Sequence, residues 1–256
     1  MKGENDMLWN MRHLENSVRA RHGNIVAERL HVPADSIAWK IEMGYYHACE
    51  SIRVLKDAIY DSRVISQNDH ESIAAAKAIL LSATKSPDAP PLNVARYQAE
   101  AHMIAAAQSL HSTADIMASV VFWALNFPIQ PKAPVEHKLN LYRVRKFLQG
   151  DVIYRSIVDA ISEVLDLHQF QYLAAYVNTT KHRSLIEVQY TAHIDPKSNP
   201  RQGLKIKGFQ YLDAQGNLNS YDGPWGEEFL FAEAQVVRNG ILAIGNSLNR
   251  FYGITV

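Results

Sequence analysis

The chain has 256 residues, of which 47% are hydrophobic and 20% are charged, and this globular composition excludes an intrinsically disordered protein. The 26 Lys and Arg residues balance 26 Asp and Glu residues, so the chain as a whole has no long-range attraction for nucleic acid or anionic membranes. Cys49 is the only cysteine. It excludes an internal disulfide and a zinc site with several cysteines, and it favours a reducing, cytoplasmic setting.

Apolar residues that recur at helical spacing predict a mostly helical chain. The expected helices are residues 5–22, 35–59, 68–81, 93–126 and 135–149, two helices within 151–182, and a last helix from about 227. Pro33 is expected to precede the second of these helices, and Asn93 is expected to cap the fourth. Prolines disrupt the interior of a helix, so the segment KSPDAPPL before Asn93 is expected to be a connector.

The period of the apolar pattern changes after Arg183. The segments LIEVQYTAHI (185–194) and GLKIKGFQYLD (203–213) alternate and are rich in β-branched and aromatic residues, which predicts a pair of strands. The expected fold class is therefore mainly α, a helical bundle with a small antiparallel β-hairpin inserted at about 185–222, before the C-terminal helix. The two proline-rich connectors, KSPDAPPL and PIQPKAPV, are short enough to be loops. Residues 1–256 are therefore expected to form a single domain.

No segment predicts contact with a membrane. The most apolar tract, IMASVVFWALNF at 116–127, is shorter than the roughly 20 residues that a membrane span needs. The first residues lack the apolar core and cleavage site of a signal peptide. Glycine-rich phosphate loops, H-E-x-x-H and G-x-S-x-G are also absent from the sequence, so no cofactor and no metal are expected. Apolar neighbours favour a buried thiol at Cys49.

One face of the helix at 93–126 carries polar side chains. Glu100, Gln108, His111 and Asp115 share an arc of about 80° when each residue turns by about 100°. His111 and Asp115 are four residues apart, close enough for the carboxylate to orient the imidazole. One interpretation is the polar wall of a cleft between helices. The other is a solvated strip, or a histidine that is satisfied by its own aspartate.

The basic residues gather in one part of the sequence. From Lys132 to Lys207 there are 12 Lys and Arg residues against 7 Asp and Glu residues. Within this part, four cations surround Tyr142, namely Lys138, Arg143, Arg145 and Lys146. Basic residues that flank an aromatic ring suit phosphate contact and base stacking. The alternative is the solvated face of an amphipathic helix.

The densest group of functional side chains is YVNTTKHR at 176–183, where a helix is expected to give way to a strand. Lys181 supplies a point charge, Arg183 a bidentate fork and His182 a proton carrier near neutral pH. The alternative interpretation is structural, because basic residues at the end of a helix interact with its last carbonyls and with its dipole.

This stretch, within a helical bundle, resembles the HEPN superfamily of prokaryotic RNA-binding and RNA-cleaving domains. The motif of that family is an arginine, commonly followed by a polar residue, and then a histidine. Asn178 matches the polar residue and His182 matches the histidine, whereas Val177 stands where the arginine would stand in the shortest spacing. Arg96 and His102 also fit the spacing, but they are expected on nearly opposite faces of a helix. The defining arginine is therefore missing.

The resemblance implies a homodimer, in which two motifs face a shared cleft, and metal-free catalysis in active members. His182 would transfer protons, Lys181 and Arg183 would stabilise the phosphate, and Asn178 would orient the histidine or the scissile group. The implied function is RNA binding, with weak metal-independent ribonuclease activity as an option, in a defence or toxin–antitoxin role. The alternative is a non-enzymatic helical module whose β-hairpin pairs with a protein partner.

Overall fold

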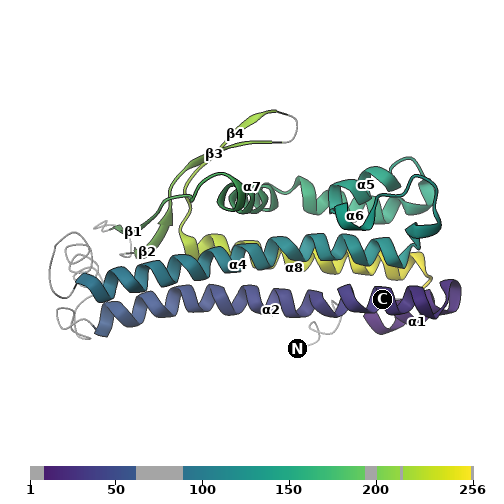
Figure 1. Ribbon diagram of the computed structural model, residues 1–256, viewed down its shortest axis with the longest axis horizontal. Coiled ribbons are helices and arrows are strands. Elements are labelled where there is room, and N and C mark those ends of the chain that lie inside the picture. The colour runs from purple at the N-terminus through teal and green to yellow at the C-terminus, as the bar shows by residue number, and fades with distance from the viewer. Residues whose placement is uncertain (1–8, 62–88, 194–200, 214–215, 255–256) are drawn as a thin grey trace. The chain divides into compact units, whose positions relative to one another are not determined.

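The structure is a computed structural model that describes residues 9–61, 89–193, 201–213 and 216–254 (Figure 1). Helices dominate these residues, and two small antiparallel sheets precede the C-terminal helix. The predicted fold class, mainly α with an inserted antiparallel β element, is confirmed. Within the described ranges, no helix combines the length and the apolar character that crossing a membrane requires.

The α-helices agree in number and order with the expected ones wherever the chain is described. They are α1 (Met11–His22), α2 (Asn24–Asp61), α4 (Ala89–Ala124), α5 (Leu141–Leu148), α6 (Arg155–Asp166), α7 (His168–His182) and α8 (Gly226–Phe251). Three short 3₁₀ helices lie between them, η1 (Phe127–Ile129), η2 (Glu136–Lys138) and η3 (Val152–Tyr154). The helix expected at 68–81 lies outside the described residues.

Three helices, α2, α4 and α5, begin elsewhere than expected. One of them is α5, which begins at Leu141 and not at Val135, because Glu136–Lys138 form a separate 3₁₀ helix. Pro33 lies inside α2, although it was expected to precede the helix. The helix thus forms despite the backbone hydrogen bond that an interior proline removes. Asn93 is not the cap of α4, because α4 already begins at Ala89. Pro90 and Pro91 fall in the first turn of α4, where the backbone N–H groups have no partner within the helix.

The β region contains two hairpins where one was expected. Strand β1 (Val188–His193) pairs with β2 (Arg201–Ile206), and β3 (Phe209–Leu212) pairs with β4 (Leu218–Tyr221). The segment 203–213, expected as one strand, therefore belongs to two. Between β3 and β4, the Asp213 carboxylate accepts a hydrogen bond from the Asn217 backbone N–H at 2.8 Å.

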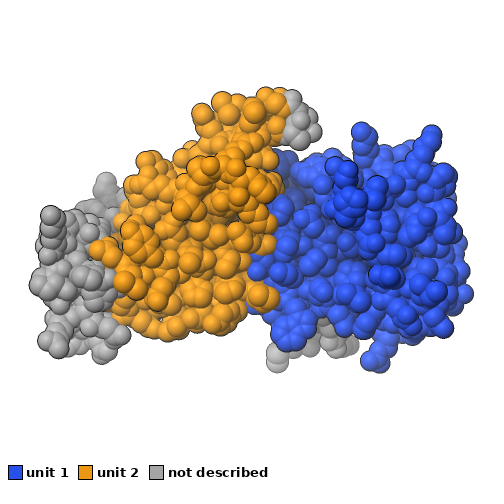
Figure 2. Space-filling view, viewed as in Figure 1, with its two compact units in different colours: residues 1–42, 109–173, 233–256 blue, residues 43–108, 174–232 orange. Residues whose placement is uncertain are grey.

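The chain divides into two compact units, which Figure 2 colours separately. Unit 1 comprises residues 1–42, 109–173 and 233–256, and unit 2 comprises residues 43–108 and 174–232. Helices α2, α4 and α8 each contribute residues to both units. The single domain predicted for residues 1–256 therefore stays a prediction.

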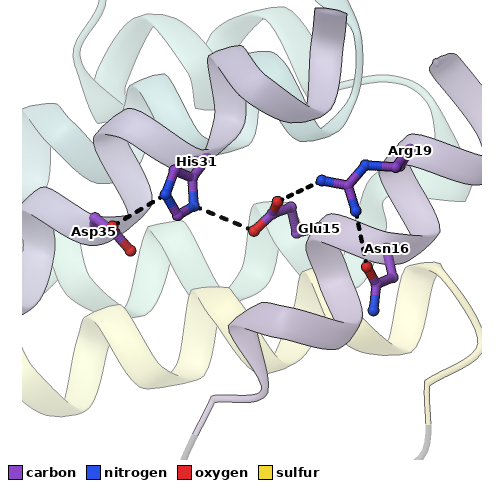
Figure 3. A network of polar contacts seen from close by, with 5 residues as sticks. All are labelled: Glu15, Asn16, Arg19, His31 and Asp35. Atoms are coloured by element: carbon purple, nitrogen blue, oxygen red, sulfur yellow. Dashed lines mark hydrogen bonds and ion pairs between the residues drawn. The ribbon is translucent and has the colours of Figure 1, made fainter. Parts of the chain in front are cut away.

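In unit 1, a polar network joins α1 to α2 (Figure 3). Glu15 accepts a hydrogen bond from Arg19 at 2.7 Å and faces Nδ1 of His31 at 3.3 Å. Nε2 of His31 lies 3.2 Å from the Asp35 carboxylate. A neutral imidazole can donate to only one of these two carboxylates, whereas the imidazolium can donate to both. The side chain of His31 is half exposed. Because its contact with Glu15 joins the two helices, we assign this network to holding α1 against α2.

In unit 2, an aromatic cluster attaches the hairpins to the helices. The Tyr176 side chain on α7 is fully buried. Its ring centroid lies 5.2 Å from that of Phe229 on α8 and 6.3 Å from that of Phe209 on β3. These contacts fix the position of β3 relative to the end of α7, which is where the candidate site lies.

Candidate functional site

Helix α7 ends within YVNTTKHR, as the sequence predicts. Val177 is fully buried and Asn178 is half buried. Lys181, His182 and Arg183 are exposed. The helical period therefore sends one side of the stretch into the core and presents its three basic residues, together with part of Asn178, at the surface.

The Arg183 side chain reaches across to β3 instead of folding back on α7. Its Nη2 donates a hydrogen bond to the Leu212 carbonyl oxygen at 2.9 Å. Its guanidinium carbon lies 4.7 Å from the centroid of the Tyr211 ring, within the range of a cation–π contact. Interaction with the last carbonyls of α7, the structural alternative for this stretch, therefore does not account for Arg183.

Half-buried aromatic rings lie on one face of the second hairpin. Phe209 and Tyr211 are two residues apart on β3, so both side chains lie on one face. The Phe209 ring stacks on that of its cross-strand partner Tyr221, with centroids 5.3 Å apart and an interplanar angle of 25°. We call Asn178, Lys181, His182, Arg183 and Tyr211 the α7–β3 surface.

Unit 2 also holds Glu100 and Gln108 of the predicted polar strip. Glu100 is half buried on α4. Burial raises the pKa of its carboxyl, and Arg96 partly opposes that shift. Burial, and then the charge of Glu100, raise the pKa of the Tyr176 phenol. Glu100 thus lies within electrostatic reach of the first residue of YVNTTKHR, a contact that the sequence did not predict.

His111 and Asp115, the other two residues of that strip, belong to unit 1. The imidazole of His111 stacks on the ring of Phe170, with centroids 6.2 Å apart and an interplanar angle of 10°. Asp115 is exposed. The four polar residues of the arc are therefore divided between the two units, and the contact of His111 with Phe170 is a packing contact within unit 1.

The basic helix α5 is amphipathic. Leu141, Val144 and Leu148 form its buried side. Of the four predicted phosphate-binding residues, Lys138, Arg143 and Lys146 are exposed. Arg145 is half buried; it donates a hydrogen bond to Asp166 at 3.2 Å and lies over the Tyr142 ring at 5.6 Å. At least one of these cations therefore serves to join α5 to α6.

A histidine pair in unit 2 was missed by the sequence analysis. Nδ1 of His47 on α2 lies 2.9 Å from Nδ1 of His102 on α4. The two residues are 55 positions apart, so only the register between α2 and α4 brings them together, and no local motif signals it. Cys49 on the same helix is exposed, which makes the expected buried thiol wrong.

Comparisons of the chain with protein-family models, with curated proteins and with solved structures find no match. The resemblance to the HEPN superfamily therefore stays a prediction that depends on the residues of YVNTTKHR and on the helical fold.

Proposed function

We propose that the α7–β3 surface binds single-stranded RNA in the manner of a HEPN-like protein. The observation that carries this proposal is the position of Arg183, held between the Leu212 carbonyl and the Tyr211 ring. This position places two exposed basic residues, Lys181 and His182, next to a hairpin with half-buried rings. Cations that track phosphates and rings that stack on bases are the two elements of single-strand recognition.

Binding without cleavage is the form of this proposal that the residues favour. His182 is an exposed proton carrier, and metal-free cleavage of RNA requires such a group. The guanidinium that the family places before Asn178 is replaced by the buried side chain of Val177. The chain therefore lacks, at that position, the stabilisation of the transition state that the guanidinium would supply. We propose a defence or toxin–antitoxin role by analogy alone, and a cytoplasmic location, because the only cysteine is suited to a reducing compartment.

Titration of single-stranded RNA of mixed sequence at several salt concentrations tests the proposal. Lys181→Ala should weaken binding and lower the slope of log K against log salt by about 0.7, the value for one lost phosphate contact on a single strand. Arg183→Ala should have the same effect on the slope. His182→Ala should abolish any chelator-resistant cleavage without unfolding the protein, because it removes the proton carrier.

Lys56→Ala is the matched control, since Lys56 is an exposed lysine on the part of α2 that belongs to unit 2. It removes the same charge and should leave the salt slope unchanged. An equal loss of slope in Lys56→Ala and Lys181→Ala would contradict a specific surface. Chelator-resistant cleavage that His182→Ala abolishes would instead make the protein a ribonuclease.

A second candidate function is supported by the tip of the second hairpin. Leu212 and Leu218 face each other across β3 and β4, and they are 45% and 62% exposed. The sheet of β3 and β4 has two strands, so its outer backbone edges are candidates for pairing with a protein. Absence of RNA binding by a folded protein would favour this protein-interaction module.

We also propose that the protein is a homodimer. The large exposed apolar side chains of unit 2 include Met43 and Tyr46 on α2, and Val94 and Tyr97 on α4. Burial of such side chains stabilises an association between subunits. Sedimentation velocity at micromolar concentration should give twice the mass of the chain. A strict monomer under these conditions would exclude the dimer.

A further inference from the structure

The histidine pair joins two helices at a defined point of unit 2. The rings of His47 and His102 are tilted by 35°, with centroids 5.2 Å apart. Their Nδ1 atoms share a hydrogen bond at 2.9 Å, in which one ring donates and the other accepts, so a metal ion bound by both nitrogens would replace the shared proton. Toward the C-terminus of α2, the buried Ser51 hydroxyl donates a hydrogen bond to the Ala99 carbonyl at 2.8 Å. This contact fixes the register of α2 on α4, so the two nitrogens are held by rigid elements.

The distance between the two nitrogens suits two adjacent ligands of one metal ion. Imidazole nitrogens bind late divalent metals at about 2.0–2.1 Å. Two such bonds to atoms 2.9 Å apart enclose an angle of roughly 90°, which is the angle between neighbouring ligands in the square-planar or tetragonal geometry of Cu²⁺ and Ni²⁺. A tetrahedral Zn²⁺ would require the nitrogens to separate by a few tenths of an ångström more.

A carboxylate and an aromatic ring lie beside the histidine pair. Glu50, one turn further along α2, is within electrostatic reach of both histidines. It is held in place by Arg53, whose Nη2 donates to its carboxylate at 2.7 Å. The Tyr46 ring lies edge-on to both imidazoles.

We propose that His47 and His102 bind one late first-row divalent cation through their Nδ1 atoms, and that the cation links α2 to α4. Among the residues that the structure describes, no three His, Cys, Asp or Glu side chains are grouped to hold a metal ion. The described residues therefore supply two ligands, and the proposal leaves the remaining coordination positions to water or to a small ligand. Glu50, which is paired with Arg53, is not one of the two proposed ligands.

The test is a calorimetric titration of the chelator-treated full-length protein with Cu²⁺, Ni²⁺ and Mg²⁺. Cu²⁺ and Ni²⁺ should bind at one ion per chain and raise the melting temperature, whereas Mg²⁺, which prefers oxygen ligands, should not bind. His47→Gln and His102→Gln should each weaken binding by at least about 100-fold, since even the outer-shell partners of a metal contribute 10–100-fold.

His31→Gln is the matched control, because His31 also lies on α2 but contacts two carboxylates and no second histidine. It should bind Cu²⁺ as the wild type does. Electron paramagnetic resonance of the wild type loaded with Cu²⁺ should show two coordinated imidazoles, a result that does not depend on the folding of any variant. One imidazole or none in that spectrum, or equal affinities of the wild type and His47→Gln, would overturn the proposal.

Discussion

Replacing Val177 with arginine is expected to unfold unit 2 rather than to create a nuclease. Val177 is fully buried on α7, directly after the equally buried Tyr176. An arginine at this position must either bury an unpaired guanidinium or force the helix out of its packing. The free energy of unfolding should fall by at least about 3–5 kcal/mol, the range for an uncompensated buried charge. Urea denaturation followed by circular dichroism measures this loss.

Ser184→Arg provides the control for the charge itself. Ser184 is exposed just beyond the end of α7, so an arginine there can remain in water and should change the stability by less than about 0.5 kcal/mol. A Val177→Arg protein that keeps the wild-type stability and cleaves RNA in the presence of chelator would contradict this prediction. It would also show that the family motif can be restored at this position.

Local periodicity predicted the parts of the candidate site that lie on one helix. The end of α7 at His182, the commitment of Val177 to the core and the exposure of the basic residues all follow from the spacing of apolar side chains along 170–183. The packing of the helices did not need to be known, because burial of one helical face sets these features.

The contacts across the fold could not be predicted in this way. Arg183 meets Tyr211 only because 203–213 breaks into two strands, which brings β3 back to the end of α7. The apolar alternation does slip by one residue there, from Leu204 and Ile206 to Phe209 and Tyr211, but such a slip does not say where the second strand goes. His47 and His102 meet because Ser51 and Ala99 fix one helix register, and a shift of α2 by one turn would separate them. Such contacts depend on tertiary packing, which single-sequence periodicity does not contain.

Glu233 was also missed, since the sequence places it beside the apolar stripe of α8. Glu233 is nevertheless buried, with an exposed fraction of 3%. None of the described residues donates a hydrogen bond to its Oε2. Burial raises the pKa of this carboxyl to about 8. The folded protein therefore holds Glu233 neutral at pH values where the unfolded chain ionises it.

Glu233→Gln is expected to remove a large pH dependence of stability. Because the pKa is raised on folding, the folded state keeps a proton that the unfolded state releases above its own pKa of 4.5. The stability of the wild type should thus fall as the pH rises from about 4.5 to about 8, by up to about 1.4 kcal/mol per pH unit. Above pH 8 the loss from this group is complete. Glutamine stays neutral throughout, so the variant should match the wild type near pH 5 and exceed its stability by a few kcal/mol at pH 8.

Urea denaturation across this pH range measures the difference between the two curves. Glu163→Gln, the same substitution at an exposed position of α6, should leave the wild-type curve unchanged. Parallel curves for the wild type and Glu233→Gln would mean that Glu233 is ionised in the folded state.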